Sequence, residues 1–285
     1  MRYGIIDIGS NSIRFMEEGK VKKLVITTRL GDGLAETGRL AESSMARSVS
    51  VIKALVSDSV HRGLIPYAYA TSAVRDAENQ KEFLERVRES CGIDIDVLSG
   101  EREAEYAFRA AAKEDGGLID IGGASFQLVT EGFTRSIKLG CVRGRDIAQA
   151  AANAASCDEN WDAQRRVITE IVSTSIALPK ILIRSWTGVG GTVTTLAAFK
   201  AGLREYDIKT VDSVILTRSD VEELIEKLHG LGEARKLEPI LNKRHDVIMY
   251  GAAILAAVMD TAGIGKIAVS SRDGMEGYLD YLKNG

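Results

Sequence analysis

The sequence predicts an α/β protein built from two related lobes that face each other across a cleft. Three observations predict this architecture. Strand and helix patterns alternate along the chain, one short strand–turn–strand segment occurs twice, and the length of 285 residues exceeds that of a typical single domain. The composition, 45% hydrophobic and 27% charged, is ordinary for a globular protein and provides enough apolar residues for a sizeable core.

The repeated segment is the most informative feature of the chain. Residues 4–19 read GIIDIGSNSIRFMEEG and residues 117–132 read GLIDIGGASFQLVTEG, an alignment without gaps at an offset of 113 residues. Eight of the 16 positions are identical, more than two unrelated hairpins would share by using common turn residues. Each copy predicts an apolar strand ending in Asp, a Gly/Ser-rich turn and a second strand. We infer a duplicated domain whose two turns face one cleft.

The remaining elements follow from hydrophobic periodicity. In the first lobe it predicts helices at 45–62, 80–91 and 101–113 and strands at 67–71 and 93–98. Gly116 and Gly117 mark the start of the second copy, so the lobe boundary is expected after residue 115. Beyond it we expect helices at 161–178, 192–200, 220–229, 246–262 and 275–282, and strands at 181–186 and 267–270.

Charge and cysteine content exclude several classes of function. The net charge of −3 lacks the basic excess of a nucleic-acid-binding protein, so we expect no nucleic-acid partner. Cys91, Cys141 and Cys157 are too few and too widely spaced to predict a disulfide framework or a zinc site. The chain begins with a strand pattern rather than a signal peptide, and its longest apolar run, 249–259, is too short for a membrane span. We therefore expect a cytoplasmic protein with no membrane partner.

The two Gly/Ser turns favour phosphate binding. Such turns expose backbone N–H groups and hydroxyls to phosphate oxygens, and Gly lets the backbone approach closely. Asp7 and Asp120 end the preceding strands, where carboxylates suit a hydrated Mg²⁺ that bridges to phosphates. A single Asp would more simply stabilise its turn, but the duplicated pair favours the metal site. The candidate phosphate-binding residues are Gly9, Ser10, Asn11 and Ser12 in the first turn and Gly122, Gly123 and Ser125 in the second.

Three further positions allow two interpretations each. Gly190, Gly191 and Thr192 lie between an apolar strand and a helix, an arrangement that binds anions but also serves close packing. Arg75 follows a strand and could contact phosphate, although by itself it is better explained by a surface ion pair. Glu103 lies in the first turn of a helix, where acidic residues commonly act as caps.

In their order along the chain, these motifs resemble the exopolyphosphatase / guanosine pentaphosphate phosphatase (Ppx/GppA) family of the sugar kinase–Hsp70–actin superfold. The likeness covers nearly the whole chain. Its motifs are DIGSNS at 7–12, ATSAVR at 70–75, LSGEREA at 98–104, DIGGAS at 120–125, LGCVR at 139–143, GVGGT at 188–192 and SSRDGMEG at 270–277. The motifs at 70–75, 98–104 and 270–277 are the ones more specific to this family.

The resemblance implies two actin-like (ribonuclease H-like) lobes, residues 1–115 and 116–273, with a C-terminal helix at 274–285 returning to the first lobe. It implies that Glu103 is the catalytic base, that Asp7 and Asp120 hold Mg²⁺ or another divalent cation, and that Arg75 binds substrate. The implied substrate is inorganic polyphosphate or guanosine pentaphosphate, and the implied assembly is a homodimer.

The chain departs from the family pattern at several positions. Arg102, Glu105 and Ala124 stand where an acidic residue, an arginine and a glycine are usual, and Gly-Arg-Asp at 144–146 replaces the frequent Leu-Thr-Glu. Longer members carry a further helical region, so we expect a preference for short phosphate chains. Two other functions stay open: a catalytically weak sensor of polyphosphate or an alarmone, and a small-molecule kinase of the same superfold that would use residues 188–192 for adenosine.

Overall fold

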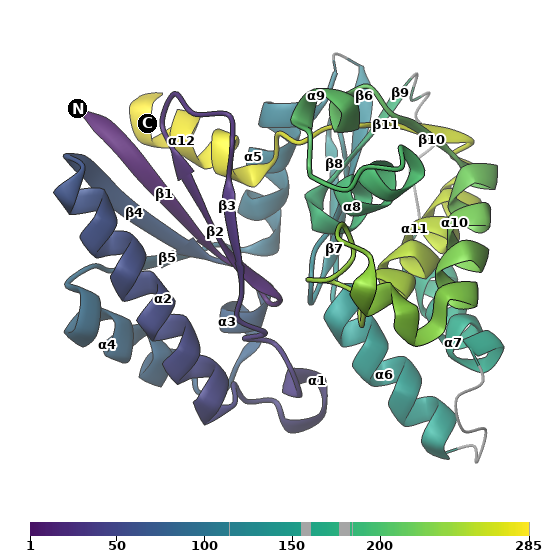
Figure 1. The fold of residues 1–285 in the computed structure, drawn as a ribbon, viewed down its shortest axis with the longest axis horizontal. Helices are drawn as coiled ribbons and strands as arrows, with labels where there is room; N and C mark the ends of the chain where they lie inside the picture. The colour runs from purple at the N-terminus through teal and green to yellow at the C-terminus, as the bar shows by residue number, and fades with distance from the viewer. Residues whose placement is uncertain (114, 155–160, 177–182, 184, 285) are drawn as a thin grey trace.

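Two β-sheets organise the computed structural model, which describes residues 1–113, 115–154, 161–176, 183 and 185–284. The first sheet consists of β1 Arg2–Ile8, β2 Ser12–Glu17, β3 Leu24–Thr27, β4 Leu64–Ala70 and β5 Ile95–Val97. The second consists of β6 Gly116–Ile121, β7 Phe126–Thr130, β8 Phe133–Ile137, β9 Ser185–Val189, β10 Ile215–Thr217 and β11 Lys266–Val269. Each sheet forms the centre of one half of the molecule (Figure 1).

The two sheets share a five-strand core, and the second sheet has one further edge strand, β10. Their strand orders are β3-β2-β1-β4-β5 and β10-β11-β9-β6-β7-β8. In each, the first three strands of the copy form an antiparallel meander, and the next strand pairs in parallel with the first strand of that meander. The structure therefore confirms the predicted fold class, a duplicated α/β architecture, and the two repeated segments form equivalent hairpins.

Helices cover both sheets and fill the space between them (Figure 1). They are α1 Leu34–Thr37, α2 Glu42–His61, α3 Ser72–Asp76, α4 Gln80–Cys91, α5 Gly100–Ala111, α6 Cys141–Ala154, α7 Trp161–Ser175, α8 Gly190–Lys200, α9 Ile208–Asp212, α10 Arg218–Leu231, the 3₁₀ helix η1 Gly232–Leu237, α11 Ile248–Ala262 and α12 Gly274–Asn284. None of the described helices is long and apolar enough to cross a bilayer.

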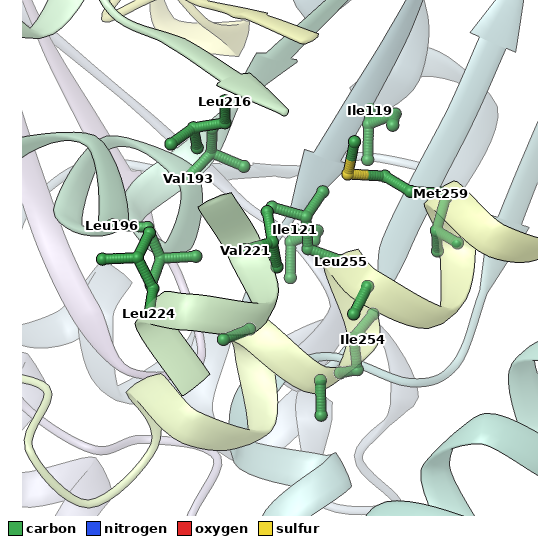
Figure 2. Close-up of a cluster of buried hydrophobic side chains, with 14 of the residues drawn as sticks. Ile119, Ile121, Val193, Leu196, Leu216, Val221, Leu224, Ile254, Leu255 and Met259 are labelled. Atoms are coloured by element: carbon green, nitrogen blue, oxygen red, sulfur yellow. The ribbon is translucent and has the colours of Figure 1, made fainter. Parts of the chain in front are cut away.

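The larger core lies in the second half of the chain. Ile119 and Ile121 of β6 pack against side chains of α8, α10 and α11, among them Leu196, Leu224 and Leu255 (Figure 2). The apolar run 249–259 forms most of α11, and it is buried all round because apolar residues occupy every face of this helix. Burial of each large aliphatic side chain of this kind contributes roughly 1.5–3 kcal/mol to stability.

Helix α5 lies between the two sheets and positions the site. It packs on β6, β7 and β8 of the second sheet, while α12 packs against α5 and β1. Met275 and Tyr278 of α12 are buried with Ile5 and Tyr69 from the first sheet, so the end of the chain returns to the first lobe. Residues of α5 consequently face both halves of the molecule.

Several elements differ from the expectation. The strand expected at 181–186 is β9, which begins at Ser185, and residues 177–182 and 184 lie outside the described part of the chain. Helix α8 begins at Gly190, two residues early, and α11 begins at Ile248, two residues late. Short or weakly periodic elements such as β3, β8, β10, α1, α3, α6 and α9 were not expected, because pairing and packing rather than local pattern stabilise them.

Candidate active site

The turns of the two repeated hairpins meet at the centre of the molecule. The Gly9 N–H donates to the Ser12 carbonyl at 3.2 Å, and the Gly122 N–H donates to the Ser125 carbonyl at 3.0 Å, the same bond at equivalent positions. The turns are in contact, since a Cβ added to Gly123 would lie 2.6 Å from the Cβ of Ser10. The duplication thus sets two amide-rich turns against each other.

A cavity of about 80 Å³ lies beside these turns, with room for several waters or one phosphate group. Eleven of the predicted site residues line it: Asp7, Gly9, Ser10, Asn11, Ser12, Glu103, Asp120, Gly122, Gly123, Gly190 and Gly191. The remaining three do not. Ser125 is buried and accepts a hydrogen bond from Gln127, Thr192 is buried in α8, and Arg75 lies behind Glu103.

Glu103 projects from α5 into this cavity and does not cap its helix. The cap is Ser99, which accepts from the Arg102 N–H at 3.2 Å, and the acidic group that interacts with Ser99 is Glu101. Arg75 Nη1 donates to Glu103 Oε2 at 3.1 Å and to the Leu98 carbonyl at 2.8 Å. Arg75 therefore orients the carboxylate of Glu103, and its predicted contact with substrate stays a prediction.

Burial raises the pKa of Glu103 to about 7, although the neighbouring Arg75 guanidinium opposes this shift and Asp7 adds to it. Near neutral pH a carboxyl group of this kind exchanges a proton readily, and perturbed pKa values of this type cluster at functional sites. The geometry is that of a buried acid–base group facing a small polar cavity.

Asp7 of the first hairpin belongs to a charged cluster. Arg14, its partner across the β1–β2 pair, forms ion pairs with both Asp7 and Asp273. Lys23 also pairs with Asp273, at 3.1 Å. Burial raises the pKa of Asp7 against the effect of Arg14, and its Oδ1 atom is buried without a hydrogen-bond partner in the described residues. One carboxylate oxygen at the cavity is thus left for another ligand.

Asp120 of the second hairpin forms no ion pair among the described residues, and the charge of Arg14 only partly offsets its burial. The residue opposite it is Gln127, and within the described ranges no hydrogen bond or ion pair reaches its carboxylate. Burial, together with the charges of Glu103 and Asp273, raises its pKa to about 7. Gly190, with φ of 83°, lies so close that an added Cβ would collide with Asp120 Oδ1, which explains the glycine at this strand–helix junction.

Arg244 is a site residue that the sequence reasoning missed. It lines the cavity, with its guanidinium against Gly191, and no carboxylate pairs with it in the parts of the chain that the structure describes. Burial lowers its pKa, but an arginine stays protonated at neutral pH. An unpaired, partly buried guanidinium is a strong phosphate ligand. The only sequence signal was a short charged run before an apolar helix.

Comparison with known proteins identifies the family of the chain. A family model described as the Ppx/GppA phosphatase family matches residues 12–283. The chain belongs to this family. Exopolyphosphatase 2 of Mycobacterium tuberculosis is 28% identical over 97% of both chains. The guanosine-5'-triphosphate,3'-diphosphate pyrophosphatase of Photobacterium profundum is also 28% identical, over 96% of this chain and 58% of its own length.

Solved structures of Ppx/GppA proteins show the same fold. A crystal structure of an exopolyphosphatase-like protein has a TM-score of 0.85 at 25% identity, with 99% of both chains covered. The Ppx/GppA family member of Aquifex aeolicus has a TM-score of 0.73 at 25% identity, covering 100% of this chain and 99% of its own.

Two departures of this Ppx/GppA chain are visible in its structure. The guanidinium of Arg102 stacks 5.6 Å from the Tyr106 ring centroid and pairs with Asp96 at 3.5 Å, away from Glu103. Arg145 links the halves of the molecule, pairing with Asp32 at 2.9 Å and Asp246 at 2.8 Å. Neither arginine lines the cavity.

Proposed function

We propose that this protein hydrolyses phosphoanhydride bonds, releasing the terminal phosphate of inorganic polyphosphate or guanosine pentaphosphate. One observation carries the proposal: a buried carboxyl group with a pKa near neutral, Glu103, faces a cavity that two Gly/Ser turns and the unpaired Arg244 line. Two similar proteins, an exopolyphosphatase and a guanosine-5'-triphosphate,3'-diphosphate pyrophosphatase, support the same class of substrate.

In the proposed reaction a water oxygen attacks the terminal phosphorus. Its proton passes to Glu103, and the bond between the terminal phosphorus and the bridging oxygen breaks, leaving a shortened chain. Arg75 holds Glu103 Oε2 in place for this transfer. Backbone amides of the two turns and the Arg244 guanidinium would stabilise the charge that develops on the phosphoryl oxygens.

The site also fits a divalent cation such as Mg²⁺. The unpartnered Oδ1 of Asp7 and the unpaired carboxylate of Asp120 are oxygen donors that line the same cavity. Mg²⁺ needs only one or two protein carboxylates, because waters and substrate phosphates complete its coordination. Asp7 and Asp120 would hold the ion, which when bound would neutralise negative charge on the phosphates.

The kinase alternative has less support. The residues expected to form a nucleotide loop, 188–192, instead pass directly from β9 into α8, and Gly190 and Gly191 line the proposed phosphate cavity.

We further propose that the protein is a cytoplasmic homodimer that prefers short phosphate chains. The small cavity and the departures from the family pattern favour this preference. Product ladders on long polyphosphate would test the chain-length preference, since processive degradation without intermediates contradicts it.

Phosphate release from a substrate panel tests the proposed function. The panel is tripolyphosphate, long polyphosphate, guanosine pentaphosphate and ATP, each with Mg²⁺ and with excess EDTA. We expect Mg²⁺-dependent release from at least one of the first three and much slower release from ATP. No release from any of them, with tight polyphosphate or alarmone binding, would instead identify a sensor. Undiminished turnover in excess EDTA would show that the reaction needs no divalent cation.

A further inference from the structure

A row of polar side chains crosses the first sheet. In the strand register, Asp7 of β1 pairs with Arg14 of β2 on one side and with Tyr69 of β4 on the other. Tyr69 in turn pairs with Asp96 of β5. Residues in register on neighbouring strands point to the same face of a sheet. Tyr69 therefore lies on the face that carries the Asp7–Arg14 ion pair, beneath α5 and α12.

The hydroxyl of Tyr69 is at the cavity and has no partner. The side chain is only 2% exposed, yet it lines the cavity together with Asp7 and Glu103. A Cβ added to Gly274 would lie 3.7 Å from its oxygen, which places that oxygen beside the start of α12. No hydrogen bond to this hydroxyl occurs within the portion of the chain described. Its ring is fixed by Tyr278, with the centroids 4.7 Å apart.

The hydroxyl of Tyr69 opens to the cavity, where water or a substrate can accept its hydrogen bond. Phenylalanine would fill the same space around the ring, so packing does not require this oxygen. Burial and the charge of Asp7 hold the pKa of Tyr69 well above its usual value, so the hydroxyl stays protonated and can donate. Apolar packing explains the ring of Tyr69 but leaves its oxygen unexplained.

We propose that Tyr69 is a further catalytic residue, whose hydroxyl donates a hydrogen bond to an oxygen of the phosphoryl group being transferred in the cavity. This inference rests on the proposed function. A fixed donor is most effective when the charge on that oxygen increases during the reaction, since it needs no reorganisation at that moment. The substrate would thus supply the partner that the hydroxyl lacks.

The test compares Tyr69→Phe with Tyr278→Phe. Tyr278 is the matched control because it is 3% exposed, packs in the same aromatic cluster and does not line the cavity. On the substrate that the wild-type protein cleaves fastest, we expect Tyr69→Phe to lower kcat about 10²-fold with little change in KM, as for loss of one such donor. Tyr278→Phe should stay within about twofold of wild type.

The pH profile and the melting temperature complete the test. A contact with phosphate lowers kcat equally at every pH, so the acidic limb of the plot of kcat against pH should keep its midpoint in Tyr69→Phe. Both variants keep the aromatic ring, so both should melt within a few degrees of wild type. An acidic limb that moves in Tyr69→Phe would show that the hydroxyl acts through Glu103, and would overturn the proposal. So would wild-type kcat in Tyr69→Phe. If the wild-type protein itself releases no phosphate, the proposed function fails, and this inference fails with it.

Discussion

The two repeated hairpins have the same backbone structure, but the charges around their Asp residues differ. Both place an Asp at the end of the first strand and close their turn with the same hydrogen bond. Across from the Asp, however, the first hairpin has Arg14 and the second has Gln127. Asp7 therefore shares a guanidinium with Asp273, whereas Asp120 has no ion pair within the described residues and burial raises its pKa to about 7.

The residues opposite Asp7 and Asp120 explain how two hairpins with the same backbone form an asymmetric site. The backbone supplies two equivalent turns, and the residue opposite each Asp, Arg14 or Gln127, differs between them. The first turn belongs to an ion cluster that ties the start of α12 to the sheet through Asp273. The second turn leaves a carboxylate that needs a metal ion or a proton, next to Glu103. Changing the residue opposite each Asp tests this account directly.

The largest expected effect is on stability, in Arg14→Gln, which makes the first hairpin like the second. Removing this guanidinium leaves two buried carboxylates short of a partner, and we expect a loss of about 3–5 kcal/mol in the free energy of unfolding. Urea denaturation measures it. Arg109→Gln removes an exposed pair with Glu105 on α5 and should cost below about 0.5 kcal/mol. Equal losses in the two variants would mean that the buried ion cluster stabilises the fold no more than an exposed ion pair does.

The next largest effect is on activity, in Asp120→Asn. If Asp120 is the carboxylate that holds the cation, its loss should lower kcat about 10²-fold and weaken the dependence on Mg²⁺ at the same time. Phosphate release as a function of Mg²⁺ concentration provides both quantities. An Asp120→Asn variant with unchanged Mg²⁺ dependence would assign the metal site to other residues.

The difference in stability between Asp120→Asn and wild type should also depend on pH. The pKa of Asp120 is 3.8 when exposed and about 7 in the fold, so the folded state binds the proton more tightly. The resulting stability is complete below pH 3.8 and is lost as the pH rises through 7. At pH 8 Asp120→Asn should therefore be more stable than wild type by on the order of 1–3 kcal/mol, since one pKa unit is worth about 1.36 kcal/mol.

The matched variant is Asp7→Asn, for which Arg14 offsets the burial of the carboxylate. Urea denaturation at pH 5 and pH 8, without divalent ions, measures the free energy of unfolding of each variant relative to wild type. From pH 5 to pH 8 this difference should increase less for Asp7→Asn than for Asp120→Asn. If the two Asn variants behave alike at pH 8, the residue across the hairpin does not control the charge of the Asp.

The smallest expected effect is in Gln127→Arg, which makes the second hairpin like the first. An arginine opposite Asp120 would compete with a divalent ion for its carboxylate and lower the pKa of Asp120 by about 1–3 units. We expect half-maximal activity to require about tenfold more Mg²⁺. Gln127→Leu, which changes the same buried side chain without adding charge, is the control. An unaltered Mg²⁺ requirement in Gln127→Arg would show that Asp120 does not bind the ion.

Sequence alone predicted the backbone of the site better than its side-chain contacts. The repeat predicted both hairpins, because eight identities in register demand a common structure, and the pattern at 80–91 coincided with α4. Eight of the eleven predicted site residues that line the cavity do so for the same reason: they are turn and strand-end residues whose place follows from the two hairpins. Glu103 reaches the cavity from α5, and Gly190 and Gly191 from the junction of β9 and α8.

The residues that sequence missed reach the cavity only through tertiary packing. Arg244 comes from the segment before α11, and Tyr69 depends on the parallel register of β4 with β1. A short charged run is the local signal for Arg244, and it does not predict contact with the cavity. The pairing of Arg75 with Glu103 joins residues 28 positions apart. The charge of a buried site depends on such long-range neighbours, which is why sequence predicted the location of the carboxylates but not their protonation.

The central claim is that Glu103 is the base of a phosphoanhydride hydrolase, and turnover by Glu103→Gln tests it most directly. Gln keeps the shape and an acceptor oxygen but cannot take the proton from water. We predict that kcat falls about 10²–10⁴-fold, without loss of stability, while Glu101→Gln, two residues earlier on the same helix, stays near wild type. Near-normal phosphate release by Glu103→Gln would contradict the account.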